Sequence, residues 1–495
     1  ATNGYDLGSD RGLTLNADTS YYNPNVDVIL GAITLGDNVT LTLGNGGPGL
    51  ISVKSISGTA TTTAGVLSGK SNVVIDSVGT VRVLGNVGTD IGTITISNSG
   101  GTTFSGTVDA ATLAVTSTTA SNTIAFSGNL TLTAGMTLGA GSAAYNVAIN
   151  GGTNTIGGAT TFNNTGTLAL GNGSDTINFT GGVVATAPSA ISVNGTVTAA
   201  GTGVITLGDS DTAVTIDGVS TIGGTSTGQI TAGAINLNNS LTLGTLATRS
   251  NAISLSSITG PSTGTADLTI VTAGAVTVGG AVGTNIGTLT ITNSGGATFN
   301  GTVSAATIAL ADSTDATTIT FNDNLNVATA MTVNASAGAN AFNVAINGTT
   351  NTIAGTTTFA NTGTLALGNG SDTINFTGGV IATAPSAVTV NGTVTAAGTG
   401  LITLGDSNTA VTIGGTSTIG GTSTGQITTG AIALNNSLTV GATAATPISL
   451  TTVTGPSSGS ANLTINTAGA VTVGGAVGTN VGTLTITNSG GTTFS

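Results

Sequence analysis

Apolar and polar residues alternate in short runs along most of the chain. Thr288–Thr292 (TLTIT) and Asn129–Thr133 (NLTLT) are two examples, and glycine, asparagine, serine or aspartate lies close to the ends of such runs. A period of two residues is typical of a β-strand with one buried face, and no stretch shows the 3.6-residue period of an amphipathic helix over a helical length. The pattern therefore predicts an all-β chain of many short strands.

Aromatic residues return at nearly regular intervals within this pattern. Within each of two sets the step is 17 to 22 residues, and Phe494 begins a third set. An aromatic residue at this interval suits a solenoid, in which each turn of chain stacks on the one before. We therefore expect an all-β fold, a right-handed parallel β-solenoid (β-helix) with rungs of about 17–22 residues and a single aromatic core ladder. The expected members of the ladder are Phe104, Phe126, Tyr145, Phe162, Phe179, Phe299, Phe321, Phe342, Phe359 and Phe376.

A much longer repeat lies above this spacing. The segment IGTITI beginning at Ile91 recurs from Ile286 as IGTLTI and from Val481 as VGTLTI, and each copy begins 195 residues after the last. Between these anchors the copies slip by two residues and recover, so that Asp175 returns at Asp372. Loops tolerate such changes of length, whereas stacked strands do not. A solenoid with a 195-residue superrepeat therefore explains both spacings.

The superrepeat divides the chain without any linker between its parts. Because the last copy is incomplete, we expect the chain to be a piece of a longer protein. The divisions are an N-terminal cap or assembly segment (1–31), a partial superrepeat (32–86), superrepeat 1 (87–281), superrepeat 2 (282–476) and the start of a further superrepeat (477–495).

The composition excludes several classes of function. The chain has neither histidine nor cysteine, so it lacks the residues of a Ser-His-Asp triad, a Cys-His pair or the usual zinc site. Five lysines and arginines against 18 aspartates give a net charge of −13, which disfavours binding to nucleic acid or anionic lipid. A carbohydrate-active β-helix enzyme stays a distant third alternative, because the aspartates are scattered and the near-identical superrepeats do not suggest one unique active site. We expect the protein not to be an enzyme.

The first 31 residues differ from the rest. They hold three of the four tyrosines, Tyr5, Tyr21 and Tyr22. One interpretation is a cap that protects the unpaired end of the solenoid, and the other is an assembly surface with these tyrosines as contacts. A chain that starts at Ala1 also suits a mature end after removal of a signal peptide, and no apolar run approaches the length of a membrane span.

One glycine-rich motif suggests calcium, the only cofactor that the sequence indicates. GNGSDTI occurs at 171–177 and again at 368–374, and it resembles the calcium-binding nonapeptide GGxGxDxUx, in which glycines turn carbonyls inward and aspartate supplies hard oxygen. The candidate ligands are Asp175 and Asp372, together with the pair Asp209 and Asp211. The alternative interpretation is a glycine turn whose aspartate binds its own backbone.

Three repeated segments, IGTLTITNSGG, TVSAATIAL and GNGSDTINFTGG, resemble the repeat passenger regions of large autotransporter-type outer-membrane proteins of bacteria. The rickettsial surface antigens, which also form a surface layer, are similar in texture. The resemblance covers nearly all of the chain from about Ala32 onward. It implies an extracellular protein of the bacterial cell surface, exported with a signal peptide that is removed.

Two functional hypotheses follow. In the first, the chain is a rigid secreted rod, the stalk or passenger of an adhesin. In the second, it is a self-assembling subunit of a surface layer, sheath or extracellular filament. The expected partners are like subunits or a ligand on a host or environmental surface, with no nucleic acid, and with a membrane only through a region absent from this chain.

Overall fold

The computed structural model describes residues 1–495 except 1–4, 7–10, 23–24, 60–61, 64–65, 68, 89, 120, 315, 336–340 and 443; the side chains of 5–6, 62–63 and 66–67 also lie outside the described part. All of the regular elements in the described part are β-strands. The chain divides into two compact units, Ala1–Thr245 and Leu246–Ser495, which we call unit 1 and unit 2. No helix in the described part has the length and apolarity needed to cross a membrane.

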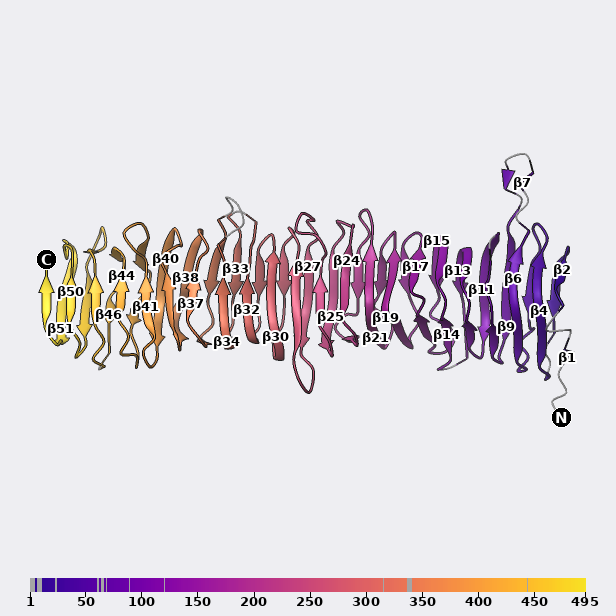
Figure 1. Cartoon of the computed structure of the whole chain (residues 1–495), viewed down its shortest axis with the longest axis horizontal. Coiled ribbons are helices and arrows are strands. Elements are labelled where there is room, and N and C mark those ends of the chain that lie inside the picture. Colours follow the sequence, from indigo (N-terminus) through magenta and orange to yellow (C-terminus); the bar gives the residue numbers. More distant parts are fainter. Residues whose placement is uncertain are drawn as a thin grey trace. The chain divides into compact units, whose positions relative to one another are not determined.

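Unit 1 contains the first 26 strands (Figure 1). They are β1 (Tyr5–Asp6), β2 (Leu13–Leu15), β3 (Thr19–Tyr21), β4 (Val28–Leu35), β5 (Thr40–Leu43), β6 (Ile51–Gly58), β7 (Thr62–Thr63), β8 (Val66–Leu67), β9 (Ser71–Ser77), β10 (Val81–Val83), β11 (Ile91–Ser99), β12 (Thr102–Phe104), β13 (Val108–Val115), β14 (Thr123–Phe126), β15 (Leu130–Leu138), β16 (Asn146–Ile149), β17 (Thr153–Ile156), β18 (Thr160–Phe162), β19 (Thr167–Phe179), β20 (Val183–Ala185), β21 (Ala190–Ala199), β22 (Ile205–Leu207), β23 (Val214–Ile216), β24 (Ser220–Gly224), β25 (Ile230–Leu237) and β26 (Leu241–Leu243).

Unit 2 contains the remaining strands. They are β27 (Ile253–Thr259), β28 (Ala266–Val271), β29 (Val276–Val278), β30 (Val282–Asn293), β31 (Ala297–Phe299), β32 (Val303–Leu310), β33 (Thr318–Phe321), β34 (Leu325–Val333), β35 (Asn343–Ile346), β36 (Thr350–Ile353), β37 (Thr357–Phe359), β38 (Thr364–Phe376), β39 (Gly379–Ala382), β40 (Ala387–Ala396), β41 (Leu401–Leu404), β42 (Ala410–Ile413), β43 (Ser417–Ile419), β44 (Ile427–Thr429), β45 (Ile432–Leu434), β46 (Leu438–Val440), β47 (Ile448–Leu450), β48 (Val453–Thr454), β49 (Ala461–Asn466), β50 (Val471–Val473), β51 (Val481–Asn488) and β52 (Thr492–Phe494).

Each unit is a parallel β-solenoid, which confirms the predicted fold class. Strands stack in parallel about 23 residues apart, as where Thr167 of β19 faces Ala190 of β21. Buried and half-buried positions alternate along β21, and the buried ones are Ile191, Val193 and Val197 among others. Because one face of each strand turns inward at every turn, the aliphatic residues form a continuous core within each unit.

The prediction of a single aromatic ladder is wrong, although all ten residues predicted to belong to it are buried. Phe104 and Phe126 face each other in β12 and β14, with ring centroids 5.1 Å apart and planes within 1°. Phe162, in contrast, pairs with Leu138, and Phe179 pairs with Ile156 in a different column of strands. The 17-residue steps therefore join aromatic residues on different strands of one turn rather than on stacked turns, which is why the turn is longer than the predicted rung.

Unit 2 shows that the 195-residue superrepeat is not a whole number of turns. Each turn contributes strands to three columns, where a column is a series of strands that pair one above another. The part of β30 that holds Leu289 lies in a column that nine successive pairings continue to β52. Leu484 is the sequence copy of Leu289, yet its strand β51 belongs to the column of Val282. The same segment in the next copy of the sequence therefore lies in a different one of the three columns. The superrepeat boundaries themselves stay predictions.

Buried serine and threonine hydroxyl groups form hydrogen bonds to backbone carbonyls at the turns. The Thr212 hydroxyl donates to the Pro188 carbonyl at 2.7 Å, and the Thr409 hydroxyl donates to the Pro385 carbonyl at 2.6 Å. Ser226 and Ser423 donate in the same way to a glycine carbonyl one turn earlier. These bonds satisfy carbonyls that the ladder leaves unpaired where the chain changes direction. Serine and threonine inside the turns are thus structural.

Tyr145 makes the stability of unit 1 dependent on alkaline pH. Its hydroxyl donates to the Gly139 carbonyl at 2.7 Å, and burial raises the pKa of Tyr145 to about 12. In the unfolded chain the tyrosine hydroxyl ionises near pH 10. The stabilisation from burying the neutral hydroxyl is therefore complete below about pH 10 and is lost as the pH rises toward 12. We expect Tyr145→Phe to remove this loss in urea unfolding curves recorded between about pH 8 and about pH 12.

The chain contains its own control, because Phe342 occupies the equivalent position of superrepeat 2 and does not ionise. Phe342→Tyr should introduce into unit 2 the alkaline loss that Tyr145→Phe removes from unit 1. An unchanged alkaline loss in Tyr145→Phe would show that another group causes it.

Candidate functional site

The candidate site lies at a corner of unit 2 where the strands are out of register. Val282 and Ile286 of β30 pair with Val303 and Ala305 of β32. The three residues of β30 between them, Gly283–Asn285, therefore face a single residue of β32, Ser304. A second register shift follows between β32 and β34, after Ala305. Extra residues of this kind make a β-bulge, which bends the strand and turns side chains out of the regular pleat. Asn285 adopts a left-handed φ of 64°, which asparagine tolerates better than most residues.

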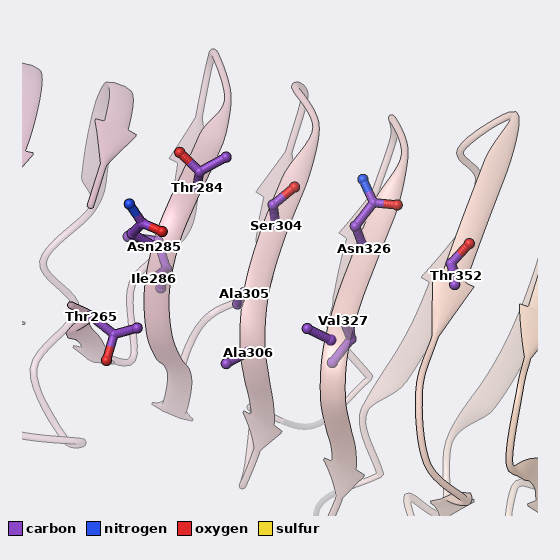
Figure 2. A pocket seen from close by; sticks show the side chains of 11 residues that line it. Thr265, Thr284, Asn285, Ile286, Ser304, Ala305, Ala306, Asn326, Val327 and Thr352 are labelled. Atoms are coloured by element: carbon purple, nitrogen blue, oxygen red, sulfur yellow. The ribbon is translucent and has the colours of Figure 1, made fainter. Parts of the chain in front are cut away.

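These shifts open a groove, which we call the corner groove, with a volume of about 490 Å³. Figure 2 shows Thr284, Ser304 and Asn326 side by side on β30, β32 and β34, with Ala305 and Val327 further along the strands. The other lining residues are Thr265, Asn285, Ile286, Ala306, Ala328 and Thr352. The volume falls in the range typical of small-molecule sites.

The groove combines polar groups that are free to bind with a floor of short apolar side chains. Thr284 and Asn326 are exposed, whereas Ala305 and Val327 are 6% and 2% exposed. Within the described part of the chain, the side chains of Thr284, Ser304 and Asn326 make no hydrogen bond. Asn285 is different, because its amide donates to the Pro261 carbonyl at 2.8 Å and holds the bulge. None of the lining residues is charged.

The corresponding corner one superrepeat earlier has a different chemistry. Lys70, Asp90 and Asp109 stand where the corner groove has Thr265, Asn285 and Ser304. Burial raises the pKa of the Asp90 carboxyl; the Asp37 carboxylate raises it further and Lys70 lowers it. The two copies of this corner therefore differ in charge, although their flanking strands are nearly the same.

The glycine-rich motif folds as a turn that its own aspartate closes. Gly171 has a left-handed φ of 83°, and the Asp175 carboxylate accepts the backbone N–H of Asn172 at 2.8 Å. In superrepeat 2 the Asp372 carboxylate accepts the N–H of Asn369 at 2.7 Å. Both carboxylates are nearly buried, and among the described residues no three histidine, cysteine or acidic side chains lie together in a group that could hold a metal ion. Calcium at Asp175 and Asp372 stays a prediction.

The pair Asp209 and Asp211 lies in a similar turn. The Asp209 carboxylate accepts the backbone N–H groups of Asp211 and Thr212 at 2.9 and 3.0 Å. Asp406 makes the same two bonds with Asn408 and Thr409 at 2.8 and 2.9 Å. Since Asn408 replaces the second carboxylate without changing the turn, the local fold needs only the first aspartate of each pair.

A turn that its own aspartate closes predicts that calcium chelation leaves thermal unfolding unchanged, whereas a calcium site predicts a lower melting temperature. Each motif carboxylate already binds a backbone N–H of its own turn, which needs no cation. Asp372→Ala should instead destabilise unit 2 by about 1–3 kcal/mol, because it leaves that N–H without its charged acceptor. The measurement is thermal unfolding of both proteins in calcium and in EDTA.

Asp211→Ala is the matched control, since Asp211 is exposed and, among the described residues, its carboxylate accepts a side-chain hydrogen bond only from the Ser210 hydroxyl, at 3.4 Å. It should change stability by less than about 0.5 kcal/mol. A lower melting temperature of the wild-type protein in EDTA, abolished by Asp372→Ala, would establish the calcium site instead.

The predicted assembly tyrosines lie near the N-terminal edge of unit 1. Tyr22 is 65% exposed and Tyr21 is half-buried in β3. Burial raises the pKa of Tyr21. The backbone of Tyr5 pairs with Val28, but its side chain lies outside the described residues. Of the two tyrosines whose side chains are described, Tyr22 is the one clearly open to a partner.

Sequence reasoning missed the corner groove altogether. The available signal was a change of residue type between superrepeats, from Lys70, Asp90 and Asp109 to uncharged residues, inside otherwise similar segments. The register shift also interrupts the alternation of apolar and polar residues, because the buried Val282, Ile286 and Leu289 stand four and three residues apart instead of two.

No protein-family model, no curated protein and no solved structure matches this chain.

Proposed function

We propose that this chain is a non-enzymatic structural protein of a bacterial cell surface, an exported β-solenoid that forms the rigid stalk or passenger of an adhesin. The resemblance of its repeats to autotransporter-type passengers supports this proposal. In this role the protein binds a ligand on a host or environmental surface and holds that binding region away from the cell. Its connection to a membrane runs through a region outside this chain.

The observation that carries the proposal is one strand that occurs twice. The sequence TLALGNGSDTINF forms β19 in unit 1 and β38 in unit 2, and the two strands have the same pattern of buried and exposed positions. A copied element with a copied environment serves length and stiffness, whereas a catalytic centre needs one arrangement found once. Parallel ladders and a continuous core also resist bending within each unit, because bending would break stacked hydrogen bonds.

Self-assembly as a subunit of a surface layer, sheath or extracellular filament is the second candidate function. The observation that favours it is Tyr22, which is 65% exposed near the N-terminal edge of unit 1. Exposed tyrosine side chains are enriched in contacts between proteins, because one ring buries a large area and its hydroxyl can still form a hydrogen bond.

Electron microscopy separates these functions. Immunogold labelling of intact cells that produce the protein should place the label on the outer surface, and label found only after lysis would contradict the surface role. Purified protein should then appear as separate particles if it is a stalk, and as ordered sheets or filaments if assembly is its function. Tyr22→Ser tests the proposed contact, and assembly unaffected by this substitution would place the contact elsewhere.

A further inference from the structure

We propose that the corner groove of unit 2 binds an uncharged oligosaccharide. The inference concerns a specific binding site and does not depend on whether the chain serves as a stalk or as an assembly subunit. Four properties of the groove lead to it: its charge, its polar rim, its apolar floor and the pairing of the strands beneath it.

Charge comes first. The lining residues are all neutral, and Arg249 is the only lysine or arginine in the sequence from 246 to 495. A phosphorylated, sulfated or carboxylated ligand would find no cation in the groove to offset the loss of its hydration. A cationic ligand would likewise find no carboxylate among the lining residues. The groove therefore fits a ligand without charge.

The rim supplies hydrogen-bonding groups in a row. The lining residues come from five successive turns, from Thr265 just before β28 to Thr352 in β36, and stacked strands lie about 4.8 Å apart. The row is thus roughly 19 Å long. It presents hydroxyl groups and the Asn326 amide, which donate and accept without carrying charge. A ligand with many hydroxyl groups along an extended chain matches this row.

The floor has the opposite character. Ile286, Ala305 and Val327 lie side by side in register on three neighbouring strands and are buried, and the small side chains of Ala306 and Ala328 follow them at the surface. A sugar ring has hydroxyl groups at its edge and C–H groups on its faces, so it can place an apolar face on the alanines while its hydroxyls reach the rim. An acyl chain would cover the floor but would leave the hydroxyl and amide groups of the rim without hydrogen-bond partners.

The strand pairing argues against an extended peptide. β30 pairs with β28 and β32, β32 also pairs with β34, and β34 also pairs with β36. Strands paired on both sides offer no free backbone edge, so a peptide cannot add to the sheet at this place. An extended uncharged ligand must therefore be bound by the side chains of the groove, and an oligosaccharide offers the hydroxyl groups that this row of side chains can bind.

Isothermal titration calorimetry on the whole chain tests the proposal. The probes are the neutral hexasaccharides of glucose in α-1,4 and β-1,4 linkage and of N-acetylglucosamine, with a heparin hexasaccharide as the charged comparison. We expect at least one neutral probe to bind and heparin not to bind. Ala306→Leu, which fills the floor, should weaken that binding at least tenfold.

Two further variants keep the test decisive. Ala111→Leu makes the same change at the corresponding corner of superrepeat 1 and should leave binding unchanged. Asn326→Ala removes an exposed amide that makes no described hydrogen bond, so the fold is retained while binding weakens. The proposal is overturned if no neutral probe binds, or if binding persists unchanged in both Ala306→Leu and Asn326→Ala. Neither result would bear on the structural role, which electron microscopy tests separately.

Discussion

Replacing Phe321 by alanine is expected to destabilise unit 2 by about 3–5 kcal/mol. Phe321 is fully buried, and its ring stacks on Phe299 with centroids 5.2 Å apart and planes within 10°. The substitution removes the ring and leaves a cavity that the stacked turns cannot close, because each strand is fixed by the ladders above and below it. Urea unfolding, followed by circular dichroism, measures the loss.

Two substitutions at the same strand serve as controls. Phe321→Leu refills most of the volume and should cost less than the alanine variant. Thr320→Ala changes the neighbouring half-buried position, which lies on the opposite face of β33, and should shift the free energy of unfolding by less than about 0.5 kcal/mol. If Phe321→Ala and Thr320→Ala had equal effects, the stacked rings would not be part of the core.

The second large effect is expected at Gly368, in the glycine-rich turn. Gly368 has a left-handed φ of 82°, and a Cβ atom placed there would lie 2.3 Å from the Asn391 carbonyl oxygen one turn later. Backbone strain and this contact act together, so Gly368→Ala should destabilise unit 2 by at least about 2 kcal/mol. Thermal and urea unfolding of the variant give the value.

Gly370 offers a matched control two residues away. A Cβ atom there would meet nothing within 4 Å, and its φ is not in the left-handed region. Gly370→Ala should therefore be nearly neutral. The comparison also separates structural from metal-binding roles of the motif, because a calcium loop would need both glycines to present carbonyls. Equal losses in the two variants would contradict the steric explanation.

The strands of this fold could be predicted from the sequence, but the length of the turn could not. Alternation of apolar and polar residues marks β21 and β33 directly, because an inward face recurs at every second residue. Neither of the two regular spacings in the sequence, the aromatic step and the superrepeat, equals the length of one turn. Steps such as Phe162 to Phe179 join different columns, and the 195-residue copy spacing includes a fraction of a turn.

The candidate site was less predictable than the fold. The sequence drew attention to Asp175 and Asp209, whose carboxylates close their own turns. The corner groove, in contrast, depends on where Ala305 and Val327 fall relative to each other across the ladder, and register between turns cannot be obtained from one strand alone. Neutral, small residues such as Ala306 also carry no chemistry that a motif search would single out.

The fractional turn in the superrepeat also determines the direction in which repeated features point. Since Leu289 and Leu484 occupy different columns, identical segments one superrepeat apart face different sides of the solenoid. Two copies of one surface segment in unit 2 therefore point in different directions rather than lying in one line along the axis. A partner that binds such a segment would meet it on more than one side of the unit, with no change in the segment's own sequence.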